Sequence, residues 1–512
     1  MADRKKAVAV IDIGMTNKKV VVFDGNLRVL ESASRNFGPV LVEGLETHDL
    51  SGIEEWLLDR LAELAGRHRI GAIAVTTHGA TLVCVDGEGR PCAPCVYYTH
   101  EPGPEFHERF YRLAGTREEL QALTGTPAFS AMINPAKGVL FLRERFPESL
   151  ARTRWLLSYP QYWGLRLTGV FGAEVTYAGC HTYLWDWEKE RYSRVAEALG
   201  IADRLPSPLR KSWEILGRIT PNVAARTGLE SDAVVTMGIH DSNASLLPHL
   251  AKRGGRDFVL NSTGTWCVLM HPQERYGFAA DELGKVVFFN RSALMKPVKT
   301  AIFTGGLEYE TWSRLIARVS GTAEPPDPGP GAYPRLMSGA SVFILPEVVP
   351  GSGQFPGSRA RAVEGGREFG LPDIESGRAV PSFLRDPAAA MAALNTSLAV
   401  QTLVALGRTG LSEGTEVYTE GGFRRNADYN ALLASALRPG STFLTDMAEA
   451  TSFGAAMTAV AALEGTDLSP LADRFELEYK PVAPMAGIGD FASYRSAWLR
   501  LAEGGRSQGR LS

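Results

Sequence analysis

The chain has 512 residues, more than a single hydrophobic core normally accommodates, so two large domains are expected. Hydrophobic residues make up 45% and charged residues 22% of it, which is typical of a globular protein. A net charge of −3 gives no basic footprint for nucleic acid, and we expect no apolar run that approaches the length of a membrane span. The N-terminus leads into a strand without a signal-peptide core, so we expect a cytoplasmic protein with neither nucleic acid nor membrane as a partner.

Residues 7–24, AVAVIDIGMTNKKVVVFD, predict two buried strands joined by a polar turn. The first strand ends in Asp12, and the turn contains Gly14 and Thr16. A P-loop or a dinucleotide fingerprint would instead continue into a helix. A glycine turn between strands can offer backbone N–H groups and the Thr16 hydroxyl to a phosphate, with Asp12 placed to hold Mg²⁺. An ordinary hairpin in which the aspartate starts a turn explains this stretch equally well.

A second unit of the same kind lies in the other half of the chain. Residues 261–265, Asn-Ser-Thr-Gly-Thr, separate two apolar runs that both read as strands. Two phosphate-type hairpins, one in each half, indicate a duplicated architecture with a nucleotide clamped between the halves.

Between these units, strands and helices alternate, which predicts an α/β domain with a mixed sheet. We expect a helix over 50–66 and strands over 70–77, 81–86 and 96–101. His78 and His100 then each follow a strand end, where open α/β sheets place ligand-binding groups. Because two such residues fall at neighbouring strand ends, substrate contact is favoured over loop-satisfying histidines.

The five cysteines are too few and too scattered for a disulfide framework. Cys92 and Cys95 form a CxxC pair, but no second metal-ligand pair matches its spacing. Structural thiols are therefore expected, rather than a redox or zinc site.

Later segments alternate between helical and loop patterns. Residues 105–172 are mainly helical in pattern, and the aromatic side chains there are interpreted as core packing, with a platform for a sugar ring as the alternative. Residues 322–334 and 348–381 are rich in proline and glycine and predict surface loops. A long helix is expected from the Asp386–Pro387 start to Gly407, and a polar tail after Ala502.

Residues 234–247, VVTMGIHDSNASLL, predict a buried strand, a short loop and the start of a helix. Asp241 lies where the helix opens, and exposed N–H groups there favour an ionised carboxylate. A plain helix cap is one explanation. The functional interpretation is a general base that takes the proton of a substrate hydroxyl as its oxygen attacks a γ-phosphate.

With these stretches in view, the chain resembles the FGGY family of carbohydrate kinases over nearly its full length. The stretches that carry the resemblance are, in chain order, Asp12-Ile-Gly14-Met-Thr16, Arg166-Leu-Thr-Gly169, Gly238-Ile-His-Asp241, Ser262-Thr-Gly-Thr-Trp266, Thr304-Gly-Gly306, Thr419-Glu-Gly-Gly422 with Asn426, and Glu449-Ala-Thr-Ser-Phe-Gly-Ala-Ala456. The resemblance implies two actin-like (ribonuclease H-like) domains around an interdomain cleft. Residues 1–247 would hold the sugar and the catalytic base, and residues 248–512 would hold ATP.

The resemblance also implies roles for individual residues. Asp241 matches the catalytic base, and Asp12 the position nearest the metal of Mg²⁺–ATP. The expected ATP contacts are Asp12, Gly14, Thr16, Lys19, Thr263, Gly264, Thr265, Gly305, Gly306, Gly421, Gly422 and Asn426. The expected sugar contacts are His78, Gly79, Tyr98, His100, Asp241 and Ser242.

The chain also departs from the family pattern. Where the family has Trp-x-Asp-x-Arg, this chain has Tyr98-Thr-His-Glu-Pro102, and Gln161 and Met15 replace an aspartate and a small hydroxyl residue. The kinase groups survive, but the sugar contacts change, so a ketose or deoxy-ketose such as rhamnulose, fuculose or xylulose is the expected class. An actin-like ATPase and a catalytically silent sugar-binding relative are the alternatives. Which sugar, which hydroxyl, and whether the chain forms a homodimer stay open.

Overall fold

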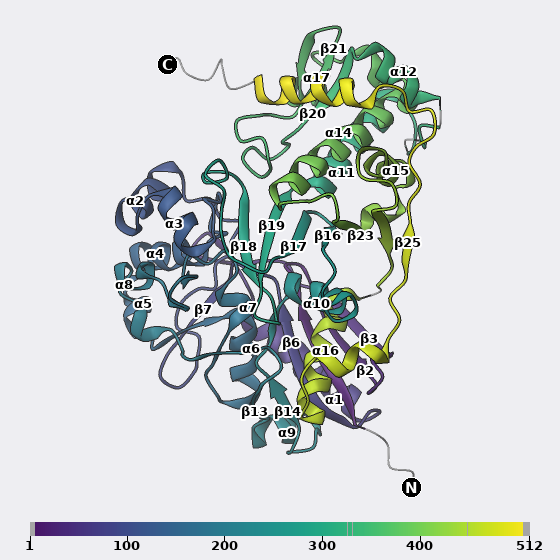
Figure 1. Cartoon of the computed structure of the whole chain (residues 1–512). Coiled ribbons are helices and arrows are strands. Elements are labelled where there is room, and N and C mark those ends of the chain that lie inside the picture. The colour runs from purple at the N-terminus through teal and green to yellow at the C-terminus, as the bar shows by residue number, and fades with distance from the viewer. Residues whose placement is uncertain (1–5, 325, 330, 448, 505–512) are drawn as a thin grey trace.

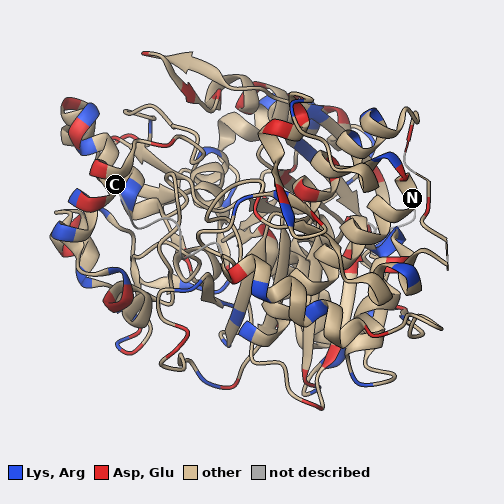
Figure 2. Ribbon diagram, turned by 90° about the horizontal axis from the view of Figure 1, so that it is seen from above, with Lys and Arg blue, Asp and Glu red and all other residues tan. Residues whose placement is uncertain are grey.

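The computed structural model describes residues 6–324, 326–329, 331–447 and 449–504. Its two halves, each built on a mixed sheet of seven strands, lie one above the other in Figure 1. The predicted tail beyond Gly504 and the first five residues lie outside the described part of the chain. Figure 2 shows basic and acidic residues interspersed over the face seen from above.

The first sheet is organised around the predicted N-terminal strand. β1 runs antiparallel to β2 and parallel to β6, and β15 extends the parallel side beside the end of β6. The strand order is β13 (Ile215–Arg218), β14 (Val234–Thr236), β6 (Ile70–Thr77), β1 (Ala7–Ile13), β2 (Asn17–Phe23) and β3 (Val29–Asn36), with β15 (Ile239–His240) also on β6.

The second sheet repeats this plan. β16 runs antiparallel to the strand that follows it, β17, and parallel to the distant strand β23. The strand order is β18 (Val287–Arg291), β19 (Pro297–Phe303), β17 (Cys267–Pro272), β16 (Phe258–Thr263), β23 (Glu416–Gly421), β24 (Thr442–Thr445) and β25 (Tyr479–Pro481). The predicted duplication is therefore confirmed at the level of sheet topology.

Helices cover both faces of the first sheet. One face packs against α1 (Leu50–Ala65), α6 (Tyr159–Thr168) and α9 (Pro221–Thr227), and the other against α10 (Asp241–Arg253) and α16 (Ala450–Glu464). α10 also buries Leu246 and Leu250 against the second sheet, so it lies at the junction of the two halves. Its N-terminus is consequently held between them.

A helical region flanks the first sheet on the left of Figure 1. Its helices are α2 (Pro104–Ala114), α3 (Arg117–Thr124), α4 (Pro135–Arg145), α5 (Pro147–Arg152), α7 (Val175–Ala178), α8 (Arg194–Ala198) and the 3₁₀ turn η1 (Ala202–Arg204). Two-stranded pairs complete it: β4 (Val40–Val42) with β5 (Leu45–Thr47), β7 (Leu82–Val85) with β8 (Trp155–Ser158), β9 (Ala173–Glu174) with β12 (Leu209–Arg210), and β10 (Trp185–Asp186) with β11 (Arg191–Tyr192).

The second sheet packs against the predicted long helix, α14 (Pro387–Arg408), which starts at the Asp386 cap as expected. The other elements of this half are α11 (Gly305–Ser320), α12 (Ala332–Gly339), α13 (Leu371–Glu375), α15 (Ala427–Ala436), α17 (Phe491–Gly504), β20 (Val342–Leu345), β21 (Arg361–Glu364), β22 (Arg367–Gly370) and the 3₁₀ turns η2 (Ser382–Arg385), η3 (Gly422–Arg425) and η4 (Ser469–Arg474).

α14 corrects one expectation from the sequence. By length and composition it could cross a membrane, although no such run was expected. In the structure 89% of its apolar window is buried among the helices and strands of the second half. The apolar run is therefore the central core helix of this half.

α16 belongs to the second half by sequence but packs on the first sheet, behind β1 and β6. It crosses α10 closely, because a Cβ at Gly454 would lie 1.8 Å from the carbonyl oxygen of Ala244. The division at residue 247 remains a prediction, and it does not follow this packing. The crossing brings the N-terminal end of α16 to the turn after β1.

Two other expectations were wrong. Residues 96–101 do not form a strand, since Val96 makes only an isolated bridge with Thr47 and prolines flank the segment. Residues 348–381 are not only loop, because β21 and β22 form a hairpin around Gly365 and Gly366. Both glycines have positive φ (56° and 80°), the backbone that such tight hairpin turns require.

Candidate active site

Three predicted residues lie at one edge of the first sheet. β1, β6 and β15 are neighbouring parallel strands, and their carboxyl ends carry Asp12, His78 and Asp241. Open α/β sheets bind ligands at this edge. Sequence positions more than 220 residues apart are thereby brought to one place.

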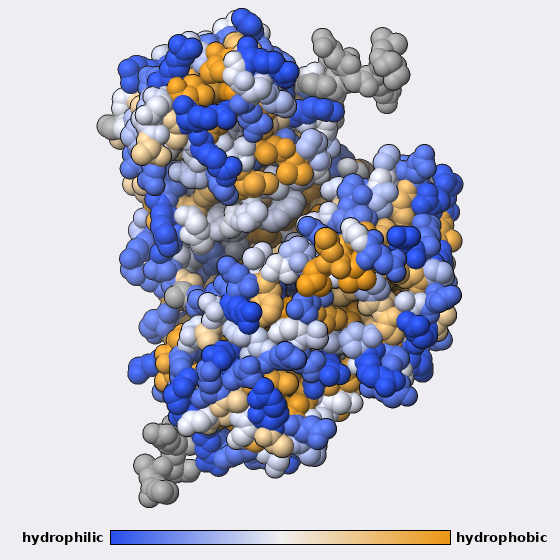
Figure 3. Space-filling view, turned by 180° about the vertical axis from the view of Figure 1, so that it is seen from behind, coloured by the Kyte–Doolittle hydropathy of each residue, from blue (hydrophilic) through white to orange (hydrophobic). Residues whose placement is uncertain are grey.

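Next to this edge is a cavity of about 380 Å³ lined by both halves. The first half contributes His78, Gly79, Ala80, Tyr98, Phe129, Ile133, Cys180, His181, His240, Asp241 and Ser242, and the second half Ser262, Thr263, Gly264, Thr265, Trp266, Val268, Phe288, Asn290 and Ile302. Figure 3 shows the molecular surface hollowed between the two halves. A ligand in the cavity would contact both halves at once.

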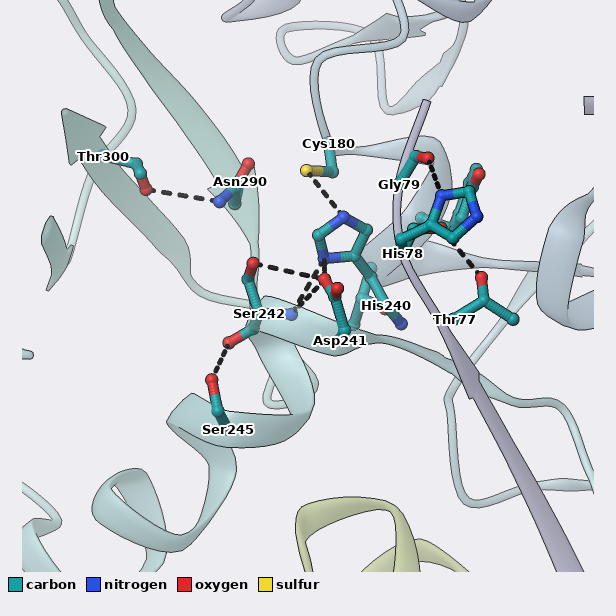
Figure 4. A network of polar contacts seen from close by, with 12 residues as sticks. Thr77, His78, Gly79, Cys180, His240, Asp241, Ser242, Ser245, Asn290 and Thr300 are labelled. Carbon is teal, nitrogen blue, oxygen red and sulfur yellow. Dashed lines mark hydrogen bonds and ion pairs between the residues drawn. The ribbon is translucent and has the colours of Figure 1, made fainter. Parts of the chain in front are cut away.

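Asp241 is the first residue of α10, and the helix cap is His240 rather than Asp241 itself. Its Oδ1 accepts hydrogen bonds from the Ser242 N–H (2.6 Å) and hydroxyl (3.3 Å), as Figure 4 shows. No described residue donates to Oδ2. Burial raises the pKa of Asp241, while His78 and the two donors of Ser242 oppose that rise. The carboxylate is therefore held by one oxygen and available through the other.

His78 lies in a cage of rings formed by His48, Tyr98 and Tyr159, with ring centroids 5.2 to 5.6 Å away. Its Nδ1 lies 2.8 Å from the Gly79 carbonyl oxygen, which fixes the proton on Nδ1. Its buried Nε2 has no partner among the described residues. Burial lowers the pKa of His78 to about 4, so it stays neutral and presents a hydrogen-bond acceptor.

His181 and His240 form a second group on the cavity wall, together with Cys180. The Nδ1 of His181 lies 3.1 Å from the Ile133 carbonyl oxygen, and the Cys180 Sγ lies 3.6 Å from the Nε2 of His240. Burial lowers the pKa of His181 to about 3 and that of His240 to about 4. Gly79 is packed against both rings, since a Cβ there would lie 2.5 Å and 2.7 Å from their Nε2 atoms.

Asp12, at the end of β1, is bonded across the halves of the sequence. The Ser452 hydroxyl at the start of α16 donates to its Oδ2 at 2.7 Å. Burial raises the pKa of Asp12 to about 6; Ser452 and Lys19 lower it, and the charges of Asp241 and Glu449 raise it further. Asp12 does not line the 380 Å³ cavity, but the two aspartates are near enough to interact. A carboxylate with one committed oxygen suits Mg²⁺, which prefers oxygen ligands and keeps several waters.

Hydrogen bonds to its backbone hold the first turn, the one that follows Asp12. The buried Lys18 ammonium donates to the carbonyl oxygens of Gly14 (3.0 Å) and Met15 (2.8 Å), and the Gly14 N–H donates to Asn17 (2.9 Å). Thr16 is exposed at the tip. The turn is therefore fixed while its tip stays open.

Lys19, expected to contact ATP, forms an ion pair with Glu449 (2.7 Å) just before α16. Both side chains are about one-third exposed. The first turn and α16 are therefore connected by two side-chain ties, which are this ion pair and the hydrogen bond from Ser452 to Asp12. Any contact of Lys19 with a phosphate would compete with it.

The second turn is built differently. The Thr263 hydroxyl donates to the Glu420 carbonyl oxygen and accepts from the Phe423 N–H (2.9 Å), so its hydrogen-bonding capacity is used within the protein. Gly264 and Thr265 are exposed at the tip. The Gly264 N–H donates to the Trp266 carbonyl oxygen (2.9 Å), so the rest of the tip backbone and the Thr265 side chain remain for a ligand.

The predicted glycines of the second half all surround this turn. A Cβ at Gly306 would lie 1.9 Å from the Gly264 carbonyl oxygen, and one at Gly421 would lie 2.0 Å from that of Thr263. Gly305 is packed against Cys267 at the start of α11, and Gly422 begins η3 directly after β23. These contacts explain why glycine stands at Gly305, Gly306 and Gly421.

Asn426 lies at the start of α15. Its side chain accepts from the Tyr429 N–H (3.0 Å) and donates to Asn395 (2.9 Å). It therefore caps the helix, and its expected contact with the nucleotide stays a prediction.

His100 does not join the cavity. It packs against Phe141, with ring centroids 5.0 Å apart, because the strand expected to carry it is absent. Sequence reasoning missed Cys180 and His181, which follow α7, and gave His240 no role. Only the adjacency of His240 to Asp241 could have signalled this group, since the segment around Cys180 has no periodic pattern.

All five cysteines are free thiols, as expected. Cys92 lies 3.3 Å from the Thr153 hydroxyl, away from the cavity, and Cys95 is buried in the core of the first half.

Comparison with known proteins gives a consistent assignment. The N-terminal domain of the FGGY family of carbohydrate kinases matches residues 7–248, and the FGGY C-terminal domain matches residues 255–467. A carbohydrate kinase from Novosphingobium aromaticivorans has a similar crystal structure, with a TM-score of 0.80 and 28% identity over 98% of this chain and all of that one. Xylulose kinase from Lactobacillus acidophilus, at 15% identity, shares the fold with a TM-score of 0.79, over 98% of this chain and 99% of that one.

Among curated sequences, L-fuculokinase of Escherichia coli is 28% identical over 280 residues, and xylulose kinase of Bacillus subtilis is 24% identical over 305. These matches cover 52% and 56% of the chain and 57% of each relative's length. The two domain matches together take in most of the chain, including both turns and Asp241. The chain belongs to the FGGY family of carbohydrate kinases.

Proposed function

We propose that the protein transfers the γ-phosphate of ATP to a hydroxyl group of a small sugar, with Asp241 as the general base. The observation that carries the proposal is the shared edge of β1, β6 and β15, which places Asp12, His78 and Asp241 together opposite the turn of the second half. Phosphoryl transfer needs positioning, charge neutralisation and one proton acceptor, and this arrangement can supply all three.

In the proposed reaction, the sugar hydroxyl lies against Oδ2 of Asp241. Asp241 accepts the hydroxyl proton as the oxygen attacks the γ-phosphorus, the bond to the β-phosphate oxygen breaks, and ADP leaves. The Ser242 N–H bonded to Oδ1 (2.6 Å) keeps the carboxylate oriented while Oδ2 accepts the proton. The raised pKa of Asp241 makes it a better acceptor than a solvent-exposed aspartate.

The phosphates of ATP would lie between the two turns. At the exposed tip, Thr265 can donate its backbone N–H and its hydroxyl, and Asp12 would hold Mg²⁺ directly or through water. Bound Mg²⁺ would neutralise phosphate charge. The two ties from α16 to the first turn keep Asp12 in place during this step.

The sugar would be recognised by neutral groups. The Nε2 atom of His78 offers an acceptor to a hydroxyl, and the Tyr98 ring and Phe129 give apolar cover. With the family's usual aspartate and arginine replaced at this position, we expect a neutral ketose or deoxy-ketose of the fuculose, rhamnulose or xylulose type. The names of the fuculose and xylulose kinase relatives support this class.

A panel of ketoses, aldoses and polyols tests the proposal through coupled measurement of ADP release. We expect release that depends on one sugar class, and a loss of about 10²- to 10⁴-fold in Asp241→Asn, the range for removing a general base. Asp203→Asn is the matched control. Asp203 is exposed and does not line the cavity, so this variant should leave turnover unchanged.

Three outcomes would contradict the proposal. Release of ADP that is indifferent to every sugar would indicate an ATPase, and no release under any condition would indicate a silent relative. Normal turnover in Asp241→Asn would remove the base from the mechanism.

A further inference from the structure

We propose that Cys180, His181 and His240 form a binding site for a zinc-type divalent ion on the wall of the cavity, with its open position facing the sugar. One ligand atom from each residue lies within 4.8 Å of the other two. A thiolate and two imidazoles are the donors that Zn²⁺ favours, and three protein ligands with one open position are typical of zinc sites that accept a further ligand.

The spacing of two ligands already matches a bound ion. With Zn–S and Zn–N bonds of the usual length, the sulfur and nitrogen of a tetrahedral site lie about 3.6 Å apart. The Cys180 Sγ and the His240 Nε2 lie 3.6 Å apart in the structure. The third ligand atom, from His181, lies within 4.8 Å of the other two and would have to move closer to complete the site.

The second nitrogen of each ring has a partner that suits metal binding. The Nδ1 of His181 is bonded to the Ile133 carbonyl oxygen (3.1 Å), which leaves the lone pair on Nε2. The Nδ1 of His240 lies 3.3 Å from Oδ1 of Asp241, so it can donate to this carboxylate when its Nε2 binds the ion. A carboxylate or carbonyl on the far nitrogen is the usual support of a metal-binding histidine.

The backbone around the cluster is also unusual. His181 has a φ of +39°, in the left-handed region, and such strain in a non-glycine residue often accompanies a functional site. Its neighbour Gly79 has no side chain, so only hydrogen lies between its Cα and the two rings. Local packing therefore holds the side chains of the cluster on the cavity wall.

Occupation of this site would affect Asp241. The Ser242 N–H is now shared between Asp241 Oδ1 (2.6 Å) and His240 Nδ1 (3.2 Å). An ion on Nε2 leaves the ring proton on Nδ1, which then donates to Asp241 Oδ1 (3.3 Å), and the ion itself lies in the same cavity as Asp241, where the sugar would bind. The site is therefore inhibitory for sugar phosphorylation, and this consequence rests on the proposed function.

Cobalt binding tests the site directly. Full-length protein freed of metals by dialysis against a chelator is titrated with Co²⁺ in excess Mg²⁺, which prefers oxygen ligands and does not compete for a thiolate. We expect one equivalent of Co²⁺ with a thiolate-to-cobalt charge-transfer band that Zn²⁺ then removes. Cys180→Ser should lose the band, while Cys92→Ser, which changes a thiol outside the cavity, should keep it.

His181→Gln is the second variant, chosen because His181 makes a single side-chain hydrogen bond and its loss disturbs folding least. It should bind Co²⁺ at least about tenfold more weakly, because the loss of even a residue that only supports a metal ligand lowers metal affinity by about that factor. Thermal unfolding of each variant checks that it is folded. Absence of the band in the unmodified protein, or an unchanged band in Cys180→Ser, would overturn the proposal.

Inhibition is measured separately. Zn²⁺ should inhibit sugar-dependent ADP release in competition with the sugar, and His181→Gln should be at least tenfold less sensitive. If no sugar is phosphorylated at all, the cobalt titration still decides whether the metal site exists. If Co²⁺ binds and Zn²⁺ leaves turnover unchanged, the inhibitory role is wrong.

Discussion

The two turns of this protein have the same topology but different chemistry. The first turn carries a charged side chain, Asp12, and two side-chain ties to α16 hold it in place. The second is held by backbone contacts to Gly306 and Gly421, and the Thr263 hydroxyl makes its hydrogen bonds within the protein. One sheet plan thus produces a turn suited to a cation and a turn suited to phosphate oxygens.

Among variants of the two turns, Asp12→Asn should have the largest effect. Loss of the carboxylate should reduce sugar-dependent turnover by about 100-fold or more, because metal neutralisation of the phosphates is worth several kcal/mol. The metal-free variant should nevertheless be no less stable than the unmodified protein near pH 7. The pKa of Asp12 is about 6 in the folded state, above its ordinary value of 3.8, so folding favours the protonated form.

The stability of Asp12→Asn relative to the unmodified protein should depend on pH. Because the folded state binds the extra proton, the contribution of Asp12 to stability is present below about pH 4 and is lost as pH rises through about 6. Thermal unfolding of both proteins without Mg²⁺ should therefore show Asp12→Asn gaining relative stability from pH 4 to pH 7. A relative loss of stability in Asp12→Asn over this range would show that burial does not raise the pKa of Asp12.

Gly306→Ala tests the second turn. The added methyl group would lie 1.9 Å from the Gly264 carbonyl oxygen, so the turn must move. We expect the KM for ATP to rise about tenfold, which corresponds to about 1.4 kcal/mol and lies within the range of about 1–3 kcal/mol that overpacking costs. Gly407→Ala, at an open position near the end of α14, is the control and should leave the KM unchanged. An unchanged KM in Gly306→Ala would show that this turn does not bind the phosphates.

Ser452→Ala should alter the first turn more gently. The Ser452 hydroxyl lowers the pKa of Asp12, so its removal raises that pKa above about 6. Since Mg²⁺ competes with the proton for Asp12, the acid limb of the pH–activity profile should move to higher pH, with a several-fold loss near pH 6 and little change at pH 8. A profile that does not move would mean that Asp12 is not the metal ligand.

The smallest effect separates the two possible roles of Lys19. Lys19→Met and Glu449→Gln break the same ion pair, whose side chains are about one-third exposed and which is worth about 0.2–1 kcal/mol. If the pair only ties the first turn to α16, both variants should change the KM for ATP equally, by a few fold. If Lys19 also binds a phosphate, Lys19→Met should have the larger effect.

Sequence reasoning recovered most of the fold because the relevant patterns were local. The buried valines of β1 and β2, the helix ended by Gly66 and the Asp386 cap of α14 each specify an element by themselves. The segment at Val96 was misread because its apolar residues pack without a pairing partner beyond one bridge. Whether this segment pairs as a strand is decided by tertiary contacts, which the sequence does not display.

The site was recovered in part for a similar reason. Asp12 and Asp241 follow buried strands, so their place at a sheet edge could be predicted. Cys180 and His181 lie in an irregular turn after α7 and reach the cavity only because Gly79 and α10 pack beside them. The crossing of α16 over α10 at Gly454, which brings Ser452 to Asp12, was likewise invisible without the fold.

The central claim is that Asp12 acts on the metal–nucleotide complex and Asp241 on the sugar hydroxyl. Calorimetric titration of ATP into both variants, with and without Mg²⁺, tests this division most directly. The account predicts that Asp241→Asn binds Mg²⁺–ATP as the unmodified protein does, whereas Asp12→Asn loses the gain in affinity that Mg²⁺ provides. Loss of Mg²⁺-dependent binding in Asp241→Asn, or its full retention in Asp12→Asn, would contradict it.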